Sequence, residues 1–423
     1  MNSLKNLIRP FIPQRLLSLY HLALAILALL WYRFPSRKLT VIGITGTKGK
    51  STTAELVHAI LEGAGHRTAL LSTIRFATPA GSSPNLFKMT MPGRFFVQRF
   101  LRQALRDGAT HAAIEITSEG AAQWRHFGIE LDALIFTNLA PEHIESHGSF
   151  ENYVAAKLSL ARLLQKSPKA RRIIVSNIDD TYGKKFLETR VEVRAPFSLK
   201  DAEPYTVDDR ECRFMWRGEL YTLHLPGRFN LYNALAALTL GEALALSPSA
   251  MKKALEEVQS VPGRAERVSR GQDFTVVVDY AHTLESLQAL YDTFPSPRIC
   301  VLGNTGGGRD RGKRPLMGAL ADSYCSLSLL TDEDPYDENP RAILDDMAKG
   351  FTKTKPHIVL NRREAIREAL RTAKTGSSVL ITGKGTDPYI MGARGSKIPW
   401  SDKHVVEEEL EALLEQKGSG AYH

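Results

Sequence analysis

The chain has 423 residues, 43% of them hydrophobic, which is enough to bury more than one core and predicts a multidomain globular protein. Its 55 Lys and Arg against 46 Asp and Glu give a formal net charge of +9, which suits an anionic substrate, an anionic membrane or nucleic acid. The basic residues are spread along the chain, with no zinc-ligand spacing and no long basic run, so we expect no nucleic-acid partner.

The three cysteines, Cys212, Cys300 and Cys325, lie far apart in the sequence. Their odd number and wide spacing match neither a disulfide framework nor a metal-ligand pair. We therefore predict buried free thiols in a reducing compartment.

The N-terminal 39 residues contain an apolar run at residues 16–32, closed by Arg15 and Arg33. As a helix this run is roughly 25 Å long, slightly short of the ~30 Å hydrocarbon core of a bilayer. Trp31 and Tyr32 beside basic residues are typical of a membrane interface. We predict a membrane-associated hydrophobic helix that either spans a thinned bilayer or lies in its plane. The alternative is an ordinary core helix, and a cleaved signal peptide fits less well because no small-residue cleavage site follows.

Short apolar segments then alternate with amphipathic ones, which predicts parallel sheets covered by helices. The first set of expected strands is LTVIGIT, HRTALLS, HAAIEIT, DALIFTN and RRIIVSN, and the second is FTVVVDYAH, RICVLGN, LSLLTDE, HIVLN and SVLITGKG. The turn signal Pro262–Gly263 in VPGRAERVSRGQ marks the expected linker. We predict an α/β protein with an N-terminal segment (1–39), a central P-loop ATPase domain (40–262) and a C-terminal Rossmann-like α/β domain (263–423).

The segment VIGITGTKGKSTTAELVHAIL reads as strand, glycine turn and helix, the context in which GKS indicates phosphate binding. Glycines let backbone N–H groups approach the phosphates, Lys50 reaches the terminal phosphates, and the Ser51 hydroxyl suits magnesium. The nucleotide-contacting residues expected here are Gly46, Thr47, Lys48, Gly49, Lys50, Ser51 and Thr52.

The form TGTKGKST resembles the nucleotide loop of Mur ligases and folylpolyglutamate synthases. Further segments are similar to successive motifs of the Mur ligases that add the third residue of the peptidoglycan stem peptide: TNLAPEHIESHGSFENYVAAK, LPGRFNLYNALAA, VPGRAERV, VVVDYAHT, GGGRDRGKRPLMG and SVLITGKGT. The resemblance runs from Val41 to about Trp400. It implies an ATP-dependent acid–amino-acid ligase in the cytoplasm or at the inner membrane face. This enzyme would join the D-Glu carboxylate of a muramoyl dipeptide, UDP-linked or lipid-linked, to a diamino acid through an acyl phosphate.

A metal site is expected beside the phosphate loop. Glu115 lies in an apolar strand, where an unpaired carboxylate is unfavourable and a metal would explain it. The resemblance assigns magnesium to Ser51, Glu115, His143 and Lys157, with Lys157 carbamylated, and makes Lys50, Glu115, His143 and Lys157 catalytic. The plain interpretation of Lys157, on an amphipathic helix, is a solvated surface charge.

The resemblance also implies ligands outside the loop. Asn233 would contact adenine, and Arg264, Asp279 and His282 would close over the nucleotide. The expected substrate residues are Arg125, Arg309, Glu333, Asp334, Gly383 and Asp387.

The chain departs from the family at several of these positions. Glu119 stands where a histidine is common, which affects recognition of the muramoyl peptide. Tyr336 stands where diaminopimelate enzymes carry an arginine that pairs with the distal carboxylate, and tyrosine cannot replace that charge pair. Acidic residues there would suit a terminal ammonium, so we hypothesise lysine, ornithine or a similar diamine.

Two other functions remain open from the sequence: a folylpolyglutamate or cyanophycin-type ligase, and a membrane-anchored P-loop NTPase switch. The oligomeric state is not predicted. Family members place a uridine-nucleotide-binding domain before the ATPase domain, whereas 39 residues precede Thr40 here. We therefore expect an acceptor that is either lipid-linked or recognised through its peptide end.

Overall fold

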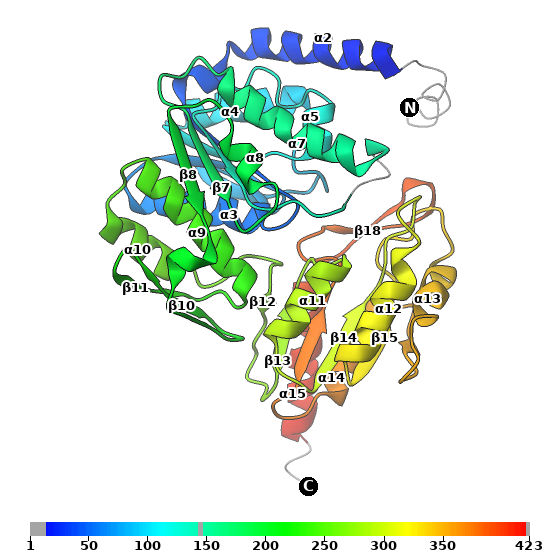
Figure 1. The fold of residues 1–423 in the computed structure, drawn as a ribbon. Coiled ribbons are helices and arrows are strands. Elements are labelled where there is room, and N and C mark those ends of the chain that lie inside the picture. The colour runs from blue at the N-terminus through cyan, green and yellow to red at the C-terminus, as the bar shows by residue number, and fades with distance from the viewer. Residues whose placement is uncertain (1–13, 143–146, 420–423) are drawn as a thin grey trace. The chain divides into compact units, whose positions relative to one another are not determined.

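The computed structural model describes residues 14–142 and 147–419 (Figure 1). By its contacts the chain divides into two compact units. The first unit comprises Met1–Glu203 and Tyr232–Glu257, and the second comprises Pro204–Leu231 and Val258–His423.

The first unit is built on an eight-stranded sheet of order β4-β3-β2-β5-β1-β6-β7-β8. Its strands are β1 (Thr40–Thr45), β2 (Thr68–Leu71), β3 (Arg75–Thr78), β4 (Gly81–Pro84), β5 (His111–Glu115), β6 (Ala133–Phe136), β7 (Ile173–Asn177) and β8 (Val193–Phe197). The strands from β2 to β8 in this order pair in parallel, and β3 and β4 extend one edge as an antiparallel hairpin. The carboxyl ends of β1, β5 and β6 therefore meet at one edge, where ligands bind in such sheets.

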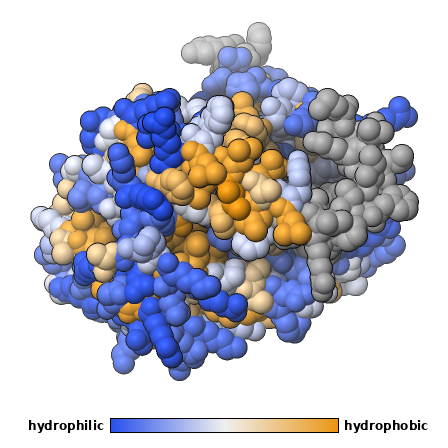
Figure 2. Space-filling model, turned by 90° about the horizontal axis from the view of Figure 1, so that it is seen from above, coloured by the Kyte–Doolittle hydropathy of each residue, from blue (hydrophilic) through white to orange (hydrophobic). Residues whose placement is uncertain are grey.

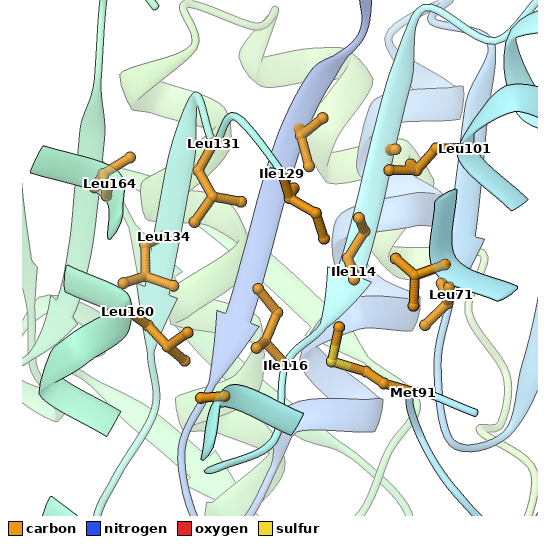
Figure 3. Packing of buried hydrophobic residues seen from close by; sticks show 14 of the residues in the cluster. Leu71, Met91, Leu101, Ile114, Ile116, Ile129, Leu131, Leu134, Leu160 and Leu164 are labelled. Carbon is orange, nitrogen blue, oxygen red and sulfur yellow. The ribbon is translucent and has the colours of Figure 1, made fainter. Parts of the chain in front are cut away.

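Helices cover both faces of this sheet. They are α2 (Gln14–Tyr32), α3 (Lys50–Gly63), α4 (Arg94–Arg106), α5 (Ser118–Ala122), α7 (Phe150–Gln165), α8 (Gly183–Leu187), α9 (Arg228–Ala243, which crosses the division between units) and α10 (Pro248–Glu256), with short 3-10 helices at Pro35–Lys38 and Leu199–Ala202. Ile114, Leu134 and Leu160 belong to the core that α4, α5 and α7 close over one face of the sheet (Figure 3). Successive residues of a strand point to opposite faces, so Ile42 and Ile44 lie on the other face, where α3 packs on β1 and β2.

The helix expected at residues 16–32 is present as α2. It packs against α4, with Ala25, Ala28 and Leu29 buried. No helix among residues 14–142 and 147–419 is both long enough and apolar enough to cross a membrane.

The second unit contains a six-stranded sheet of order β12-β13-β17-β14-β15-β16, parallel except for the edge strand β12. Its strands are β12 (Glu266–Arg267), β13 (Thr275–Val278), β14 (Arg298–Leu302), β15 (Leu327–Leu330), β16 (His357–Ile358) and β17 (Ser378–Ile381). The helices are α11 (Leu284–Thr293), α12 (Lys313–Tyr324), α13 (Pro340–Ala348), α14 (Arg362–Thr372), α15 (Asp402–Ser419) and a 3-10 turn at Ala393–Gly395. Two apolar clusters, one on each face of the sheet, make its core.

Two small antiparallel sheets complete the second unit. One consists of β9 (Tyr205–Val207), β10 (Cys212–Trp216) and β11 (Glu219–Leu223), and the other of β18 (Tyr389–Met391) and β19 (Lys397–Pro399). The parallel-sheet α/β fold predicted from the sequence is confirmed for both units.

The prediction of free thiols is wrong for two of the three cysteines. Cys300 in β14 and Cys325 at the C-terminal end of α12 form a disulfide, with their Cα atoms 6.1 Å apart. Cys212 is free and buried. The two cysteines are 25 residues apart in the sequence, so their spacing alone does not predict the contact. The contact forms because the C-terminal end of α12 lies beside β14.

Candidate active site

The phosphate loop joins β1 to α3, with Gly49 as the residue that precedes the helix. Gly46 and Gly49 have φ angles of 151° and 80°, in the region that favours glycine. A Cβ on Gly46 would lie 1.9 Å from the Thr137 hydroxyl oxygen, and one on Gly49 would lie 2.2 Å from the Asn233 side-chain oxygen. The loop therefore tolerates no side chain at either position, and Asn233 lies against it in the first unit.

Residues at the end of β6 hydrogen-bond to the backbone of the phosphate loop and fix its position. The Lys48 N–H donates to Asn138 Oδ1 at 2.8 Å, and the Thr47 N–H donates to the Asn138 carbonyl oxygen at 2.8 Å. The Thr137 hydroxyl donates to the Lys48 carbonyl oxygen at 2.7 Å. Thr137 and Asn138 are thus positioning residues that the sequence analysis missed, although they end the expected strand DALIFTN.

Gly46→Ala is expected to lower ATP affinity by about 100-fold, because the added methyl group must displace either Thr137 or the loop, and such strain is worth roughly 1–3 kcal/mol. Calorimetric titration with ATP measures the effect. Gly65→Ala is the matched control, since Gly65 also has a positive φ angle but nothing lies within 4 Å of its added Cβ. Equal ATP binding by both variants would contradict this account of the loop.

The lysines of the loop are held by local partners. Lys50 Nζ donates to the Thr47 carbonyl oxygen at 2.7 Å, and Lys48 Nζ lies 2.7 Å from Glu142 Oε1. Thr52 is buried in the first turn of α3. The loop therefore carries two ammonium groups where terminal phosphates are expected.

Glu115 ends β5 and is 1% exposed. Its carboxylate accepts from the Ser51 hydroxyl at 3.1 and 3.2 Å, and from the Thr73 N–H at 2.7 Å and the Thr73 hydroxyl at 3.0 Å. Ser51 and Glu115 are thus brought together as predicted, while Thr73 was missed. A hydroxyl and a carboxylate are the oxygen donors that Mg²⁺ prefers, so this pair fits a magnesium ion.

Two further metal ligands were expected, His143 and Lys157, and the structure describes only Lys157. His143 lies outside the described residues. Within the described ranges, no group of three or more His, Cys, Asp or Glu side chains gathers as a metal site. Ser51 and Glu115 are the described residues whose oxygens fit the metal, and a part for Lys157 in holding it stays a prediction.

Lys157 is not a solvated surface charge, since it is 1% exposed on α7. Its Nζ donates to the Gly46 carbonyl oxygen at 2.6 Å and lies 4.9 Å from the centre of the Tyr153 ring. Burial, followed by the charge of Lys50, lowers the pKa of Lys157 well below its ordinary value. The uncharged amine, which is the nucleophilic form, is therefore favoured beside the loop.

Tyr153 also fixes the loop, because its hydroxyl lies 2.9 Å from the Thr47 hydroxyl. Burial raises the pKa of Tyr153 above its ordinary value, so the phenol stays protonated and can donate this hydrogen bond. The sequence analysis did not single out this tyrosine, which lies one helical turn before Lys157 on α7.

Arg125 lies just after α5, the short helix that follows β5. Its guanidinium donates to the Met91 carbonyl oxygen at 2.6 Å and to Gln123 Oε1 at 2.8 Å. Burial lowers the pKa of Arg125, and the nearby Glu119 charge opposes that shift. The unusual Glu119 therefore acts electrostatically on the expected acceptor-binding arginine.

The second unit brings Arg264, Asp279 and His282 together. The Asp279 carboxylate accepts from the Ala265 N–H at 2.6 Å, the Arg264 guanidinium lies 4.4 Å from the Tyr280 ring centre, and His282 Nδ1 lies 2.8 Å from the Tyr280 carbonyl oxygen. Burial raises the pKa of Asp279, and the Arg264 charge opposes this. Their closure over a nucleotide stays a prediction.

A buried carboxylate follows β15. Glu333 Oε1 accepts from the Thr305 hydroxyl at 2.8 Å, and Glu333 Oε2 is buried without a hydrogen-bond partner among the described residues. A Cβ on Gly383 would lie 2.3 Å from this second oxygen, and the φ of Gly383 is 104°. Glycine at 383 therefore lets the backbone pack closely against this buried oxygen.

Asp334 has a different environment from its neighbour. It accepts from Lys384 Nζ at 2.9 Å and from the Met391 N–H at 2.8 Å, and Asp387 lies 3.5 Å from the same lysine nitrogen. Lys384 is fully buried. Asp334 is thus largely compensated within the unit, and the exposed Arg309 lies on the loop between β14 and α12.

A phosphate loop next to a buried carboxylate and a buried lysine, followed by an α/β unit with an acidic site, defines an ATP-dependent amide-bond ligase. Family models agree: the Mur ligase middle domain matches residues 44–241, and the Mur ligase glutamate ligase domain matches residues 263–385. The chain belongs to the Mur ligase family.

Relatives support this assignment over most of the chain. The UDP-N-acetylmuramoyl-L-alanyl-D-glutamate–2,6-diaminopimelate ligase of Syntrophomonas wolfei is 34% identical over 406 residues, which covers 92% of this chain and 81% of that protein. A solved structure of an enzyme with that name has a TM-score of 0.61 at 28% identity, covering 89% of this chain and 79% of that one. Mycobacterium tuberculosis folylpolyglutamate synthase, at 17% identity, a TM-score of 0.68 and coverage of 85% and 92%, shares the fold.

Proposed function

We propose that the protein joins a diamino acid to the D-Glu carboxylate of a muramoyl dipeptide during peptidoglycan synthesis. The names of its relatives support the acceptor, since they act on UDP-N-acetylmuramoyl-L-alanyl-D-glutamate. The observation that carries the chemistry is the arrangement around the phosphate loop, where Glu115 contacts Ser51 and the buried Lys157 contacts Gly46.

The reaction has two displacements. An oxygen of the acceptor carboxylate attacks the terminal phosphorus of ATP, and the bond to ADP breaks, which leaves an acyl phosphate. The uncharged amine then attacks the acyl carbon, phosphate leaves with the bonding electron pair, and the nitrogen loses a proton to give the amide. Lys50, Lys48 and the backbone N–H groups of the loop stabilise the negative charge that gathers on the transferred phosphoryl group.

Magnesium, when bound, would neutralise charge on the phosphates, and Ser51 and Glu115 would hold it. Lys157 would join them as a carbamate. Its uncharged amine attacks the carbon of CO₂, a nitrogen–carbon bond forms and one proton is released. This converts a cation that would repel the metal into an anion that attracts it, and the lowered pKa of Lys157 favours the reactive form.

The identity of the amine follows from the acidic site of the second unit. Glu333 offers a buried oxygen that can accept from an ammonium group, whereas Tyr336 provides no cation for a distal carboxylate. We therefore infer lysine, ornithine or a similar diamine, although the relatives named above are diaminopimelate ligases.

Glu333→Gln is expected to lower kcat/KM for lysine by about 100-fold, because the lost hydrogen bond to a charged group is worth roughly 1.5–3 kcal/mol.

Tyr336→Arg should raise the relative kcat/KM for meso-diaminopimelate by about tenfold through a new charge pair. Steady-state kinetics with lysine, ornithine and meso-diaminopimelate measure both. The exposed Asp337→Asn is the control for Glu333→Gln. A clear preference of the unaltered protein for meso-diaminopimelate would sink this assignment.

ATP turnover separates a ligase from an NTPase switch. The ligase should release ADP only when a muramoyl dipeptide and an amine are both present. A switch protein would hydrolyse ATP without either substrate, and that result would remove the ligase proposal.

The muramoyl dipeptide is carried either by a uridine nucleotide or by a lipid. Arg125 is the residue we expect to contact the muramoyl peptide in both cases. We also propose attachment to the inner face of the cytoplasmic membrane through residues 16–32, which would concentrate the enzyme near a membrane-bound acceptor.

A further inference from the structure

Between Leu19 and Trp31, the outward side of α2 carries large apolar side chains. Six large side chains between 41% and 73% exposed lie on it: Leu19, Tyr20, Ile26, Leu27, Leu30 and Trp31. Their spacing of three, four and seven residues places them on one side of the helix. Figure 2 shows apolar side chains gathered on the face of the molecule that carries α2. We call these six residues the α2 apolar face.

The distribution of apolar side chains on α2 is the reverse of that on an ordinary surface helix. Its buried side consists of the small residues Ala25 and Ala28 together with Leu29, which packs so closely on Gly128 that a Cβ there would lie 2.5 Å from Leu29. A helix adapted to water would bury its large apolar side chains and expose polar ones. The larger apolar surface of α2 therefore points away from the fold, toward an apolar partner.

The charges beside this face select the kind of partner. Arg33, Arg37 and Lys38 are exposed directly after Trp31, and no Asp or Glu occurs in the sequence before Glu55. Arg37 also pairs with Glu130 at 2.8 Å, and Arg33 and Lys38 are further exposed cations near the helix end. Apolar side chains, an interfacial tryptophan and basic residues together match an anionic lipid surface.

We propose that the α2 apolar face docks in the plane of an anionic membrane leaflet, while the opposite side of α2 stays packed on α4. We expect the helix to lie flat because its alanine side is already packed on the fold. The docking specifies the attachment proposed above and does not depend on the ligation chemistry.

Vesicle sedimentation of the full chain tests the docking. Vesicles of phosphatidylcholine with phosphatidylglycerol should bind the protein, and vesicles of phosphatidylcholine alone should bind it at least about tenfold more weakly. The double variant Ile26→Glu with Leu30→Glu should lose at least about tenfold of the binding to anionic vesicles. The matched control is Leu220→Glu with Leu360→Glu, which places two charges at exposed leucines of the second unit.

Quenching of tryptophan fluorescence by brominated lipid gives the second readout. The unaltered protein should be quenched, and Trp31→Phe should remove most of that quenching. Circular dichroism establishes that each variant is folded. Absence of vesicle binding by the unaltered protein, or equal binding by the Ile26→Glu and Leu30→Glu variant, would overturn the proposal.

Two parallel measurements separate other outcomes. A dimer that becomes monomeric in the Ile26→Glu and Leu30→Glu variant, without vesicle binding by either protein, would show that the face joins two copies and would also overturn the proposal. Ligation of a soluble acceptor without vesicles should be unchanged in that variant, so failure of the docking and failure of the proposed function are distinguishable.

Discussion

Lys157→Ala is expected to lower kcat for ligation by about 10³-fold, the size of effect seen when one preorganised charge-stabilising group is removed. The reason is that Lys157 lies against the phosphate loop, donates to the Gly46 carbonyl oxygen and is buried, which lowers its pKa well below the ordinary value. As a carbamate it would add a second anion to the Glu115 carboxylate beside the phosphate loop.

Three observations separate a carbamate from a packing role. Lys157→Met keeps most of the buried volume and should remain folded, yet should be as inactive as Lys157→Ala. Short carboxylic acids added to Lys157→Ala should partly restore ligation, because they can occupy the space of the missing carbamate. A carbamate carbon signal in the nuclear magnetic resonance spectrum with ¹³C-labelled CO₂ should appear only when Lys157 is present. Near-normal ligation by Lys157→Ala without added acid would remove the carbamate hypothesis.

Glu115→Gln is the second large effect, with an expected loss of about 10²- to 10³-fold in kcat. Glutamine keeps an oxygen for the Ser51 and Thr73 donors, so the end of β5 should stay folded, but it removes the charge that would hold magnesium. The apparent affinity for Mg²⁺ should fall together with kcat. Glu115→Ala and Lys50→Ala should also abolish ligation.

Kinetics at varied Mg²⁺ concentration measure this effect. Glu62→Gln, at a half-exposed carboxylate of α3, is the matched control and should leave kcat and the Mg²⁺ requirement unchanged. If Glu115→Gln kept full activity at the same Mg²⁺ concentration, Glu115 would be a structural hydrogen-bond acceptor and not a metal ligand.

The sequence predicted the main sheets well because buried parallel strands have a strong signature. Apolar runs such as HAAIEIT and SVLITGKG become β5 and β17. The small antiparallel sheet β9–β11 was missed because its strands alternate apolar and polar residues over only three to five positions. Its assignment to the second unit depends on contacts between residues distant in sequence.

The candidate site was partly predictable. The glycine loop, Ser51 and Glu115 come together because they follow neighbouring strands β1 and β5. Thr73 was missed because it lies outside any motif. Thr137 and Tyr153 lie inside the motif TNLAPEHIESHGSFENYVAAK, but a threonine or tyrosine there carries no signal of its own that it will contact the phosphate loop. The disulfide was missed because helix α12 determines whether Cys325 can reach Cys300. For α2, the sequence predicted a helix, but only the structure shows which side is buried.

Mass spectrometry of the reaction products tests the central claim most directly. The protein is incubated with ATP, Mg²⁺, a UDP-linked or lipid-linked muramoyl dipeptide and a panel of amino acids. The account predicts a muramoyl tripeptide whose mass equals dipeptide plus diamino acid minus one water, with one ADP and one phosphate released per product. ADP formation without any new muramoyl species, or an identical rate of ATP hydrolysis when the dipeptide is omitted, would contradict it.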